Sequence, residues 1–187
     1  MAGILNQFSI LIWSDPGIRD PQAPSENGIR KSGTHWIGED GQLRRPGGFF
    51  LDKYLKRVGY SVNPEIKIFA RPYTTNVLHC WTGRRNGRRD RQPTAAELQN
   101  CKPWWHKEIE FIRPRVVILL GKPAAESFSA VCGDDRPFKD LIVAQGEWMQ
   151  FGDTSIKRYV LPHPTAPYPE KSAIYSTVFK LVSVDLK

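Results

Sequence analysis

Residues 115–120 (RVVILL) most constrain what this chain can fold into. Five apolar residues in succession are typical of a central strand whose two faces are both covered. Gly121 and Lys122 end the run, and residues 123–131 that follow have the composition of a helix. A strand of this kind needs other elements to cover both of its faces.

The rest of the chain alternates short strand-like runs with helical segments. Strands are predicted at residues 8–13 (FSILIW), 65–70 (EIKIFA) and 157–161, and helices at residues 49–58, 94–112, 123–131 and 171–186. Thr94 and Glu97 have the spacing of a capping box. The alternation predicts an α/β fold with a largely parallel sheet, and 187 residues suffice for a single domain.

Four polar or glycine positions directly follow strand-like or apolar runs: Asp15, Asn76, Gly121 and His163. In open α/β sheets, ligands bind at the carboxyl ends of the strands. We therefore expect these four positions to converge on one cleft.

The net charge of +8 and the pI of about 9.5 favour polyanionic partners, because phosphates that are neutralised by a protein release counterions. The most basic segment is residues 83–93 (GRRNGRRDRQP), whose arginines are expected to contact DNA phosphates: Arg84, Arg85, Arg88, Arg89 and Arg91. A solvated loop is the alternative. No apolar run approaches the roughly 18 residues that span a bilayer. We expect a cytoplasmic monomer without a membrane partner.

The three cysteines, Cys80, Cys101 and Cys132, include no CxxC pair. An odd count without a secretion signal argues against a disulfide framework. We therefore expect no disulfide, metal site or cofactor.

Four segments, taken in order, resemble the uracil-DNA glycosylase superfamily, and most closely its family 4 branch. They are YTTNVLHC at 73–80, RQPTAAELQNCKPWW at 91–105, RPRVVILLGKPAAESF at 113–128 and LPHPTAPYP at 161–169. The segment GGFFLDKYL at 47–55 is similar to the helix that follows the first motif of that family. The resemblance implies a three-layer α/β/α fold around a central, largely parallel four-stranded sheet, with an inserted loop at about residues 18–46.

The chain departs from family 4 in three respects. That branch holds an iron–sulfur cluster with four cysteines, and only Cys80 and Cys101 match, so we expect no cluster. The first motif reads WSDPG, which places Asp15 where related families have Asp or Asn. The long segment after Gly17 blurs the alignment of the residue that stacks on the base: Leu43 lies nearest, and Phe49, Phe50 or Tyr73 could replace it.

The resemblance implies a role for each site residue. Asp15 would stabilise the sugar cation and orient water, Asn76 would read the base edge, and His163 would donate a hydrogen bond to the departing base. Thr165 and Tyr168 lie where relatives contact DNA, and Tyr168 would fill the gap left by the flipped base. Turn or loop-capping roles are the alternatives for Asp15, Asn76 and His163.

The predicted function is a monofunctional DNA glycosylase that leaves an abasic site. One candidate substrate is a bulky 5-substituted phage pyrimidine, such as glucosylated hydroxymethylcytosine, excised in phage defence. Another is uracil, excised in DNA repair. A non-catalytic DNA-binding protein and a base-modifying transferase are further alternatives.

Overall fold

The computed structural model describes residues 10–14, 42–43, 46–78, 84–85, 89–90 and 93–187. Its main sheet has five strands in the order β2-β1-β5-β7-β6. These strands are β1 (Ile10–Ser14), β2 (Tyr73–Asn76), β5 (Val116–Leu120), β6 (Glu147–Phe151) and β7 (Thr154–Leu161). The pairs β1/β2, β1/β5 and β5/β7 are parallel, whereas β6 pairs antiparallel with β7 at the edge. The predicted α/β class is confirmed.

The apolar run that was predicted as a doubly covered strand is β5, in the middle of the sheet. All five of its residues are buried. Val117 and Leu119 belong to one core cluster, whereas Val116, Ile118 and Leu120 belong to the other. Successive side chains of a strand point to opposite faces, so the two clusters lie on opposite sides of the sheet.

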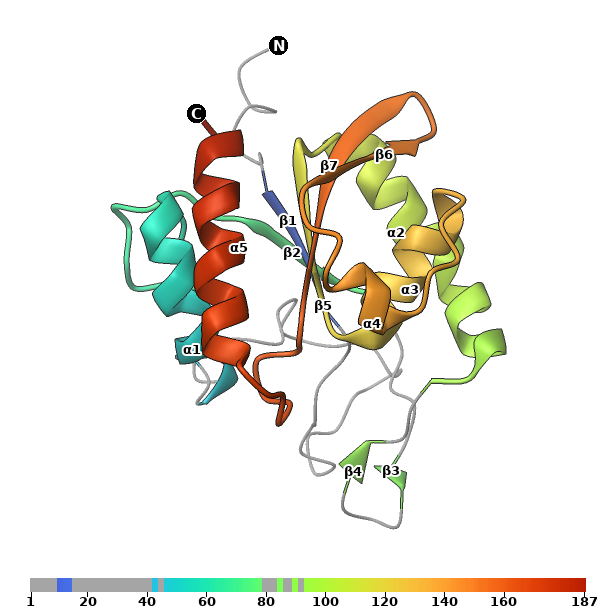
Figure 1. The fold of residues 1–187 in the computed structure, drawn as a ribbon, viewed down its shortest axis with the longest axis horizontal. Coiled ribbons are helices and arrows are strands. Elements are labelled where there is room, and N and C mark those ends of the chain that lie inside the picture. The colour runs from blue at the N-terminus through green and yellow to red at the C-terminus, as the bar shows by residue number, and fades with distance from the viewer. Residues whose placement is uncertain (1–9, 15–41, 44–45, 79–83, 86–88, 91–92) are drawn as a thin grey trace.

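Helices cover both faces and complete three layers (Figure 1). On one side lie α1 (Gly47–Leu55), which continues into the 3-10 turn η3 (Lys56–Val58), and α5 (Lys171–Asp185). On the other side lie α2 (Ala95–Ile112), α3 (Lys122–Val131) and the short α4 (Phe138–Leu141). None of the helices within the described residues is apolar over a length that would cross a bilayer.

The predicted capping box at the start of α2 is confirmed. The Thr94 hydroxyl accepts a hydrogen bond from the Glu97 backbone N–H at 3.3 Å, and the Glu97 carboxylate accepts one from the Thr94 N–H at 2.8 Å. These bonds satisfy backbone groups that would otherwise lack partners at a helix start. The N-terminal boundary of α2 is therefore local in origin.

Two predictions differ from the structure. The sheet has five strands instead of four, because residues 147–151 form a hairpin with β7. Residues 65–70 are not a strand: Ile68 is 87% exposed, and only Ala70 forms an isolated bridge, with Tyr60. The alternation of apolar residues there does not meet a buried face, and the strand forms at Tyr73–Asn76 instead.

The basic segment contains a two-stranded antiparallel hairpin, β3 (Arg84–Arg85) with β4 (Arg89–Asp90). Figure 1 shows this hairpin beyond the end of the sheet where β5 and β7 finish. The positively charged segment is therefore at the end where α/β sheets bind ligands.

Candidate functional site

The carboxyl ends of the four parallel strands are aligned in one row. Ser14 is in register with both Asn76 and Leu120, and Leu120 is in register with Leu161. Three inter-strand spacings of about 4.8 Å separate β2 from β7, a span of roughly 14 Å. Asn76 and the residues that follow β5 and β7 therefore border one edge of the sheet. Asp15 follows Ser14 in sequence but lies outside the described residues.

Gly121 brings the segment after β7 close to the start of α3. Its backbone N–H donates to the Leu161 carbonyl at 2.8 Å, and a Cβ on Gly121 would lie 3.4 Å from the His163 Cβ. The φ angle of Gly121 is 91°, in the region that favours glycine. A glycine at this position thus permits the approach of His163 to the end of β5.

The His163 imidazole is neutral near neutral pH. Burial and, to a lesser extent, the positive charge of Lys171 together lower its pKa to about 4. Its Nδ1 accepts a hydrogen bond from the Thr165 backbone N–H at 3.4 Å and lies 2.8 Å from the Thr165 hydroxyl oxygen. Since Nδ1 is an acceptor, the proton of the neutral ring is assigned to Nε2. Nε2–H is therefore the donor that this ring offers.

Asn76 and Tyr73 belong to different faces of β2. Tyr73 and Thr75 both interact with Glu108 of α2. The Thr75 hydroxyl donates to the Glu108 carboxylate at 2.7 Å. Burial and, to a lesser extent, the interaction with Glu108 raise the pKa of Tyr73 to about 12. Asn76 is 9% exposed and, by strand alternation, points to the face covered by α1 and α5. The structure therefore does not bring Tyr73 and Asn76 together on one face.

The remaining stacking candidates are at α1 and just before it. Phe49 is 45% exposed, whereas Leu43 is 7% exposed and packs within the core cluster between the sheet and α1 and α5. The Phe50 ring lies 4.8 Å, centroid to centroid, from the Tyr175 ring of α5. Among these residues Phe49 offers the most accessible aromatic surface.

The loop between β7 and α5 carries Thr165 and Tyr168. Thr165 is exposed and holds the His163 ring, as described above. Tyr168 is half-buried, and its ring lies edge-on to that of Phe138 in α4 at a centroid distance of 6.4 Å. The aromatic ring predicted to enter DNA thus packs against the protein in this structure.

Several predicted residues can be located only in part. Arg84, Arg85 and Arg89 lie on the β3–β4 hairpin, while Arg88 and Arg91 are outside the described residues, as is Cys80. Cys101 belongs to α2 and is buried in the core. Within the described ranges, no group of three or more His, Cys, Asp or Glu side chains could hold a metal ion.

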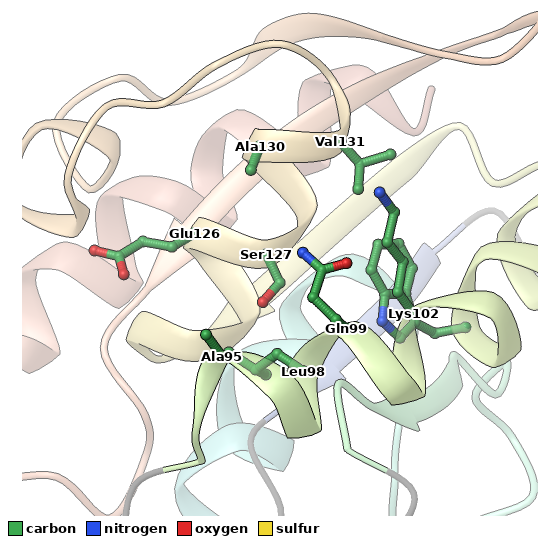
Figure 2. A pocket seen from close by; sticks show the side chains of 9 residues that line it. Ala95, Leu98, Gln99, Lys102, Glu126, Ser127, Ala130 and Val131 are labelled. Carbon is green, nitrogen blue, oxygen red and sulfur yellow. The ribbon is translucent and has the colours of Figure 1, made fainter.

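A groove of about 350 Å³ runs between α2 and α3 on the opposite face from α1 and α5 (Figure 2). Its lining includes the polar side chains Gln99, Lys102, Glu126 and Ser127 and the ring of Trp105. Neither Asn76 nor His163 contributes to it. This groove is therefore separate from the row of strand ends.

Sequence reasoning missed two residues that hold the site. Lys171 donates hydrogen bonds to backbone carbonyls of the β7–α5 loop, and Glu108 binds the strand that carries Asn76. A lysine at the start of a helix and a glutamate within one are common in any soluble protein, so the sequence held no signal for either role.

Comparison with known proteins agrees with this geometry. The profile of the Uracil DNA glycosylase superfamily matches residues 14–180. The chain is also similar to the Type-5 uracil-DNA glycosylase of Pyrobaculum aerophilum, with 29% identity over 112 residues, which are 59% of this chain and 46% of that relative. The matched segment thus spans less than half the length of the relative. Because the profile covers most of the chain, including β5, α3 and the His163 loop, this protein belongs to the uracil DNA glycosylase superfamily.

Proposed function

We propose that this protein is a monofunctional DNA glycosylase that hydrolyses the N-glycosidic bond of a flipped-out pyrimidine and leaves an abasic site. The observation that carries the proposal is His163 just beyond the aligned strand ends, with its Nδ1 accepting from the Thr165 backbone N–H, in a chain of this superfamily. Net charge +8 and the arginine-containing hairpin beyond the same strand ends are consistent with a DNA substrate.

The chemistry follows from the charges that develop when the bond breaks. The C1′–N1 bond cleaves and its electron pair leaves with the base, so that negative charge appears on the base oxygen and positive charge on the sugar. His163 donates a hydrogen bond from Nε2–H to that oxygen, which stabilises the leaving base without a formal proton transfer. Asp15 stabilises the sugar cation and removes a proton from the attacking water, whose oxygen forms the new bond to C1′.

Recognition of the base is assigned to Asn76 and an aromatic ring. The Asn76 amide can both donate to and accept from the Watson–Crick edge of a pyrimidine, and Asn76 lies at the end of β2 beside β1. Phe49, with 45% of its surface exposed, is better placed to stack on the base than the buried Leu43.

Two substrates are favoured by different observations. The similar protein from Pyrobaculum aerophilum is described as a uracil-DNA glycosylase, which favours uracil and a role in base-excision repair. The long polar segment at 18–46 favours a bulky 5-substituted pyrimidine, such as glucosylated hydroxymethylcytosine, because buried polar groups discriminate between substituents better than apolar walls. The latter substrate would make the protein a phage-defence enzyme.

Mass spectrometry of released bases tests the function and separates the two substrates. The protein is incubated with uracil-containing duplexes, with unmodified DNA and with phage genomes that carry hypermodified pyrimidines. We expect a free pyrimidine and an equal number of abasic sites from one of the modified or uracil-containing DNAs.

Variants identify the catalytic groups in the same assay. Asp15→Asn and His163→Gln are each expected to slow excision by at least about a hundredfold, since each removes transition-state stabilisation. Asp135→Asn, at an exposed position after α3, is the matched control and should be unchanged. Release of no base from any of these DNAs would contradict the proposed function.

A further inference from the structure

The β7–α5 loop is held from the first two turns of α5 by side chains one helical turn apart. The Lys171 ammonium donates to the Pro164 carbonyl at 2.7 Å and to the Ala166 carbonyl at 2.8 Å. The Tyr175 hydroxyl donates to the Pro162 carbonyl at 2.7 Å. These three carbonyls lie on both sides of His163, so the helix determines the path of the backbone that carries the imidazole.

The Lys171 side chain is itself held in place. Its ammonium lies 5.1 Å from the centroid of the Phe50 ring of α1, a favourable cation–π distance. The Phe50 ring also packs on Tyr175. A lysine confined between an aromatic ring and two carbonyls is an ordered structural element, unlike a lysine that extends into water.

We infer that Lys171 is a positioning residue for His163, acting through the backbone of the β7–α5 loop and through its charge. The effect of Lys171 on the reaction rate rests on the proposed function, whereas its effect on the loop and on the pKa of His163 does not depend on any reaction. Two hydrogen bonds to carbonyls fix the loop, and a permanent positive charge nearby disfavours a second positive charge on the imidazole. Lys171 thus serves both the placement and the neutrality of the same ring.

Two other charged groups lie on the segments next to His163 in the described part of the chain. Glu170 is exposed at the start of α5, and Lys122 on the β5–α3 turn lies 3.9 Å from Glu126 in an i,i+4 pair. The Thr165 hydroxyl contacts the ring directly. Lys171 supplies the electrostatic part of the lowered pKa of His163, after burial.

The test begins with NMR of the free protein, which needs no substrate. The imidazole of His163 is followed through a pH titration and assigned by its loss in His163→Gln. In Lys171→Met, which retains the length and removes the charge and the donors, we expect the pKa of His163 to rise by at least about half a unit. Amide exchange at Ala166 and Thr165 should accelerate by at least about tenfold.

Two further variants separate the positioning role of Lys171 from a general effect of removing a lysine from α5. Lys171→Arg retains charge and donors and should restore the wild-type titration, whereas Lys180→Met, at an exposed position on the same helix, should leave it unchanged. If Lys171→Met does not give a native spectrum, Lys171→Gln, which loses the charge but keeps a donor, is titrated instead. An unchanged His163 titration together with unchanged loop exchange overturns the inference.

Kinetics connect the inference to catalysis. On a DNA from which wild type releases a base, Lys171→Met should lower the single-turnover rate about tenfold, because the placement of His163 is impaired. The DNA concentration that gives half the maximal rate should change less than about threefold, because the DNA-binding surface remains. Equal rates for the Met and wild-type proteins would contradict the catalytic consequence. If wild type releases no base at all, the proposed function fails, and the NMR result still decides the role of Lys171.

Discussion

His163 is the residue whose chemistry depends most on its surroundings. A histidine in water titrates near pH 6.5 and would be partly charged in a cell. Here burial and Lys171 lower its pKa to about 4, so the ring remains a neutral hydrogen-bond donor throughout the physiological range. A neutral donor suits the proposed departing base, because it stabilises the developing negative charge by a hydrogen bond alone.

We predict that the lowered pKa of His163 makes the protein less stable in mild acid. Between the ordinary value of 6.5 and about 4, the unfolded chain binds a proton that the folded ring does not, so the free energy of unfolding falls as pH falls through this window. The His163 contribution should amount to about 2 kcal/mol between pH 7 and pH 5. Urea unfolding at both pH values, in wild type and His163→Gln, measures it.

The control for this measurement is Val143→Ala, at an exposed position without an ionisable group, which should retain the pH dependence of wild type. The same titration predicts that excision does not decline through loss of neutral His163 until the pH approaches 4. An NMR midpoint near 6.5 for His163, or identical pH slopes in wild type and His163→Gln, would falsify the neutral-ring interpretation.

At the scale of elements, α3, β6 and β7 are joined by one buried cation. Arg158 of β7 is 0% exposed and donates to Asp134, after α3, and to Glu147 of β6, each at 2.6 Å. It also donates to the Ser129 hydroxyl of α3 at 2.7 Å. Arg136 binds the same two carboxylates from the solvent side. Burial of a guanidinium is tolerable only with such partners.

We predict that Asp134→Asn lowers the free energy of unfolding by about 3 kcal/mol, because it leaves the buried Arg158 without its more buried carboxylate partner. The hydrogen bonds from Arg136 and Arg158 hold the pKa of Asp134 below its usual range. The stabilisation should therefore be present above about pH 4 and be lost as pH falls further.

Chemical denaturation at neutral pH measures the effect of Asp134→Asn. The matched control is Asp135→Asn, one residue along the chain and exposed, which should change stability by less than about 0.5 kcal/mol. Equal stability of the two variants would mean that Glu147 alone suffices for Arg158.

At the scale of the whole molecule, arginines lie at both ends of the sheet. Arg113 and Arg115, at the amino end of β5, are engaged with Asp153 and with the Asp185 carbonyl. Arg84 and Arg85 lie on β3, beyond the carboxyl end (Figure 1). If DNA binds at the row of strand ends, only the arginines at the carboxyl end should contact its phosphates.

We predict that Arg84→Ser with Arg85→Ser weakens binding equally for target and non-target duplexes, because phosphate contacts carry no sequence information. The slope of log affinity against log salt should decrease in magnitude by about 0.9 for each phosphate that is no longer neutralised. Arg113→Ser with Arg115→Ser removes the same charge at the other end and should change the slope little. Equal changes for both double variants would exclude a specific role for the hairpin.

Local signals in the sequence were sufficient for much of the fold. The run at 115–120 became β5, the Thr94–Glu97 pair capped α2, and the α/β class followed from alternation. The strand predictions failed where the alternation of apolar and polar residues did not show which face is covered. Residues 65–70 alternate, but Ile68 faces solvent. Residues 147–151 form β6 because they pair with β7. Alternation reports a half-buried face only if a partner covers that face.

The sequence by itself determined the family, the position of His163 after a strand, and the predominance of positive charge, since motifs, apolar runs and charges are properties of the chain. Only the tertiary structure decided which of these act together. It placed Tyr73 on the opposite face from Asn76 and buried Leu43, and it brought Lys171 onto the loop of His163. Burial, register and contacts between distant residues exist only after packing, and they determine which side chain remains neutral, which is exposed and which holds another in place.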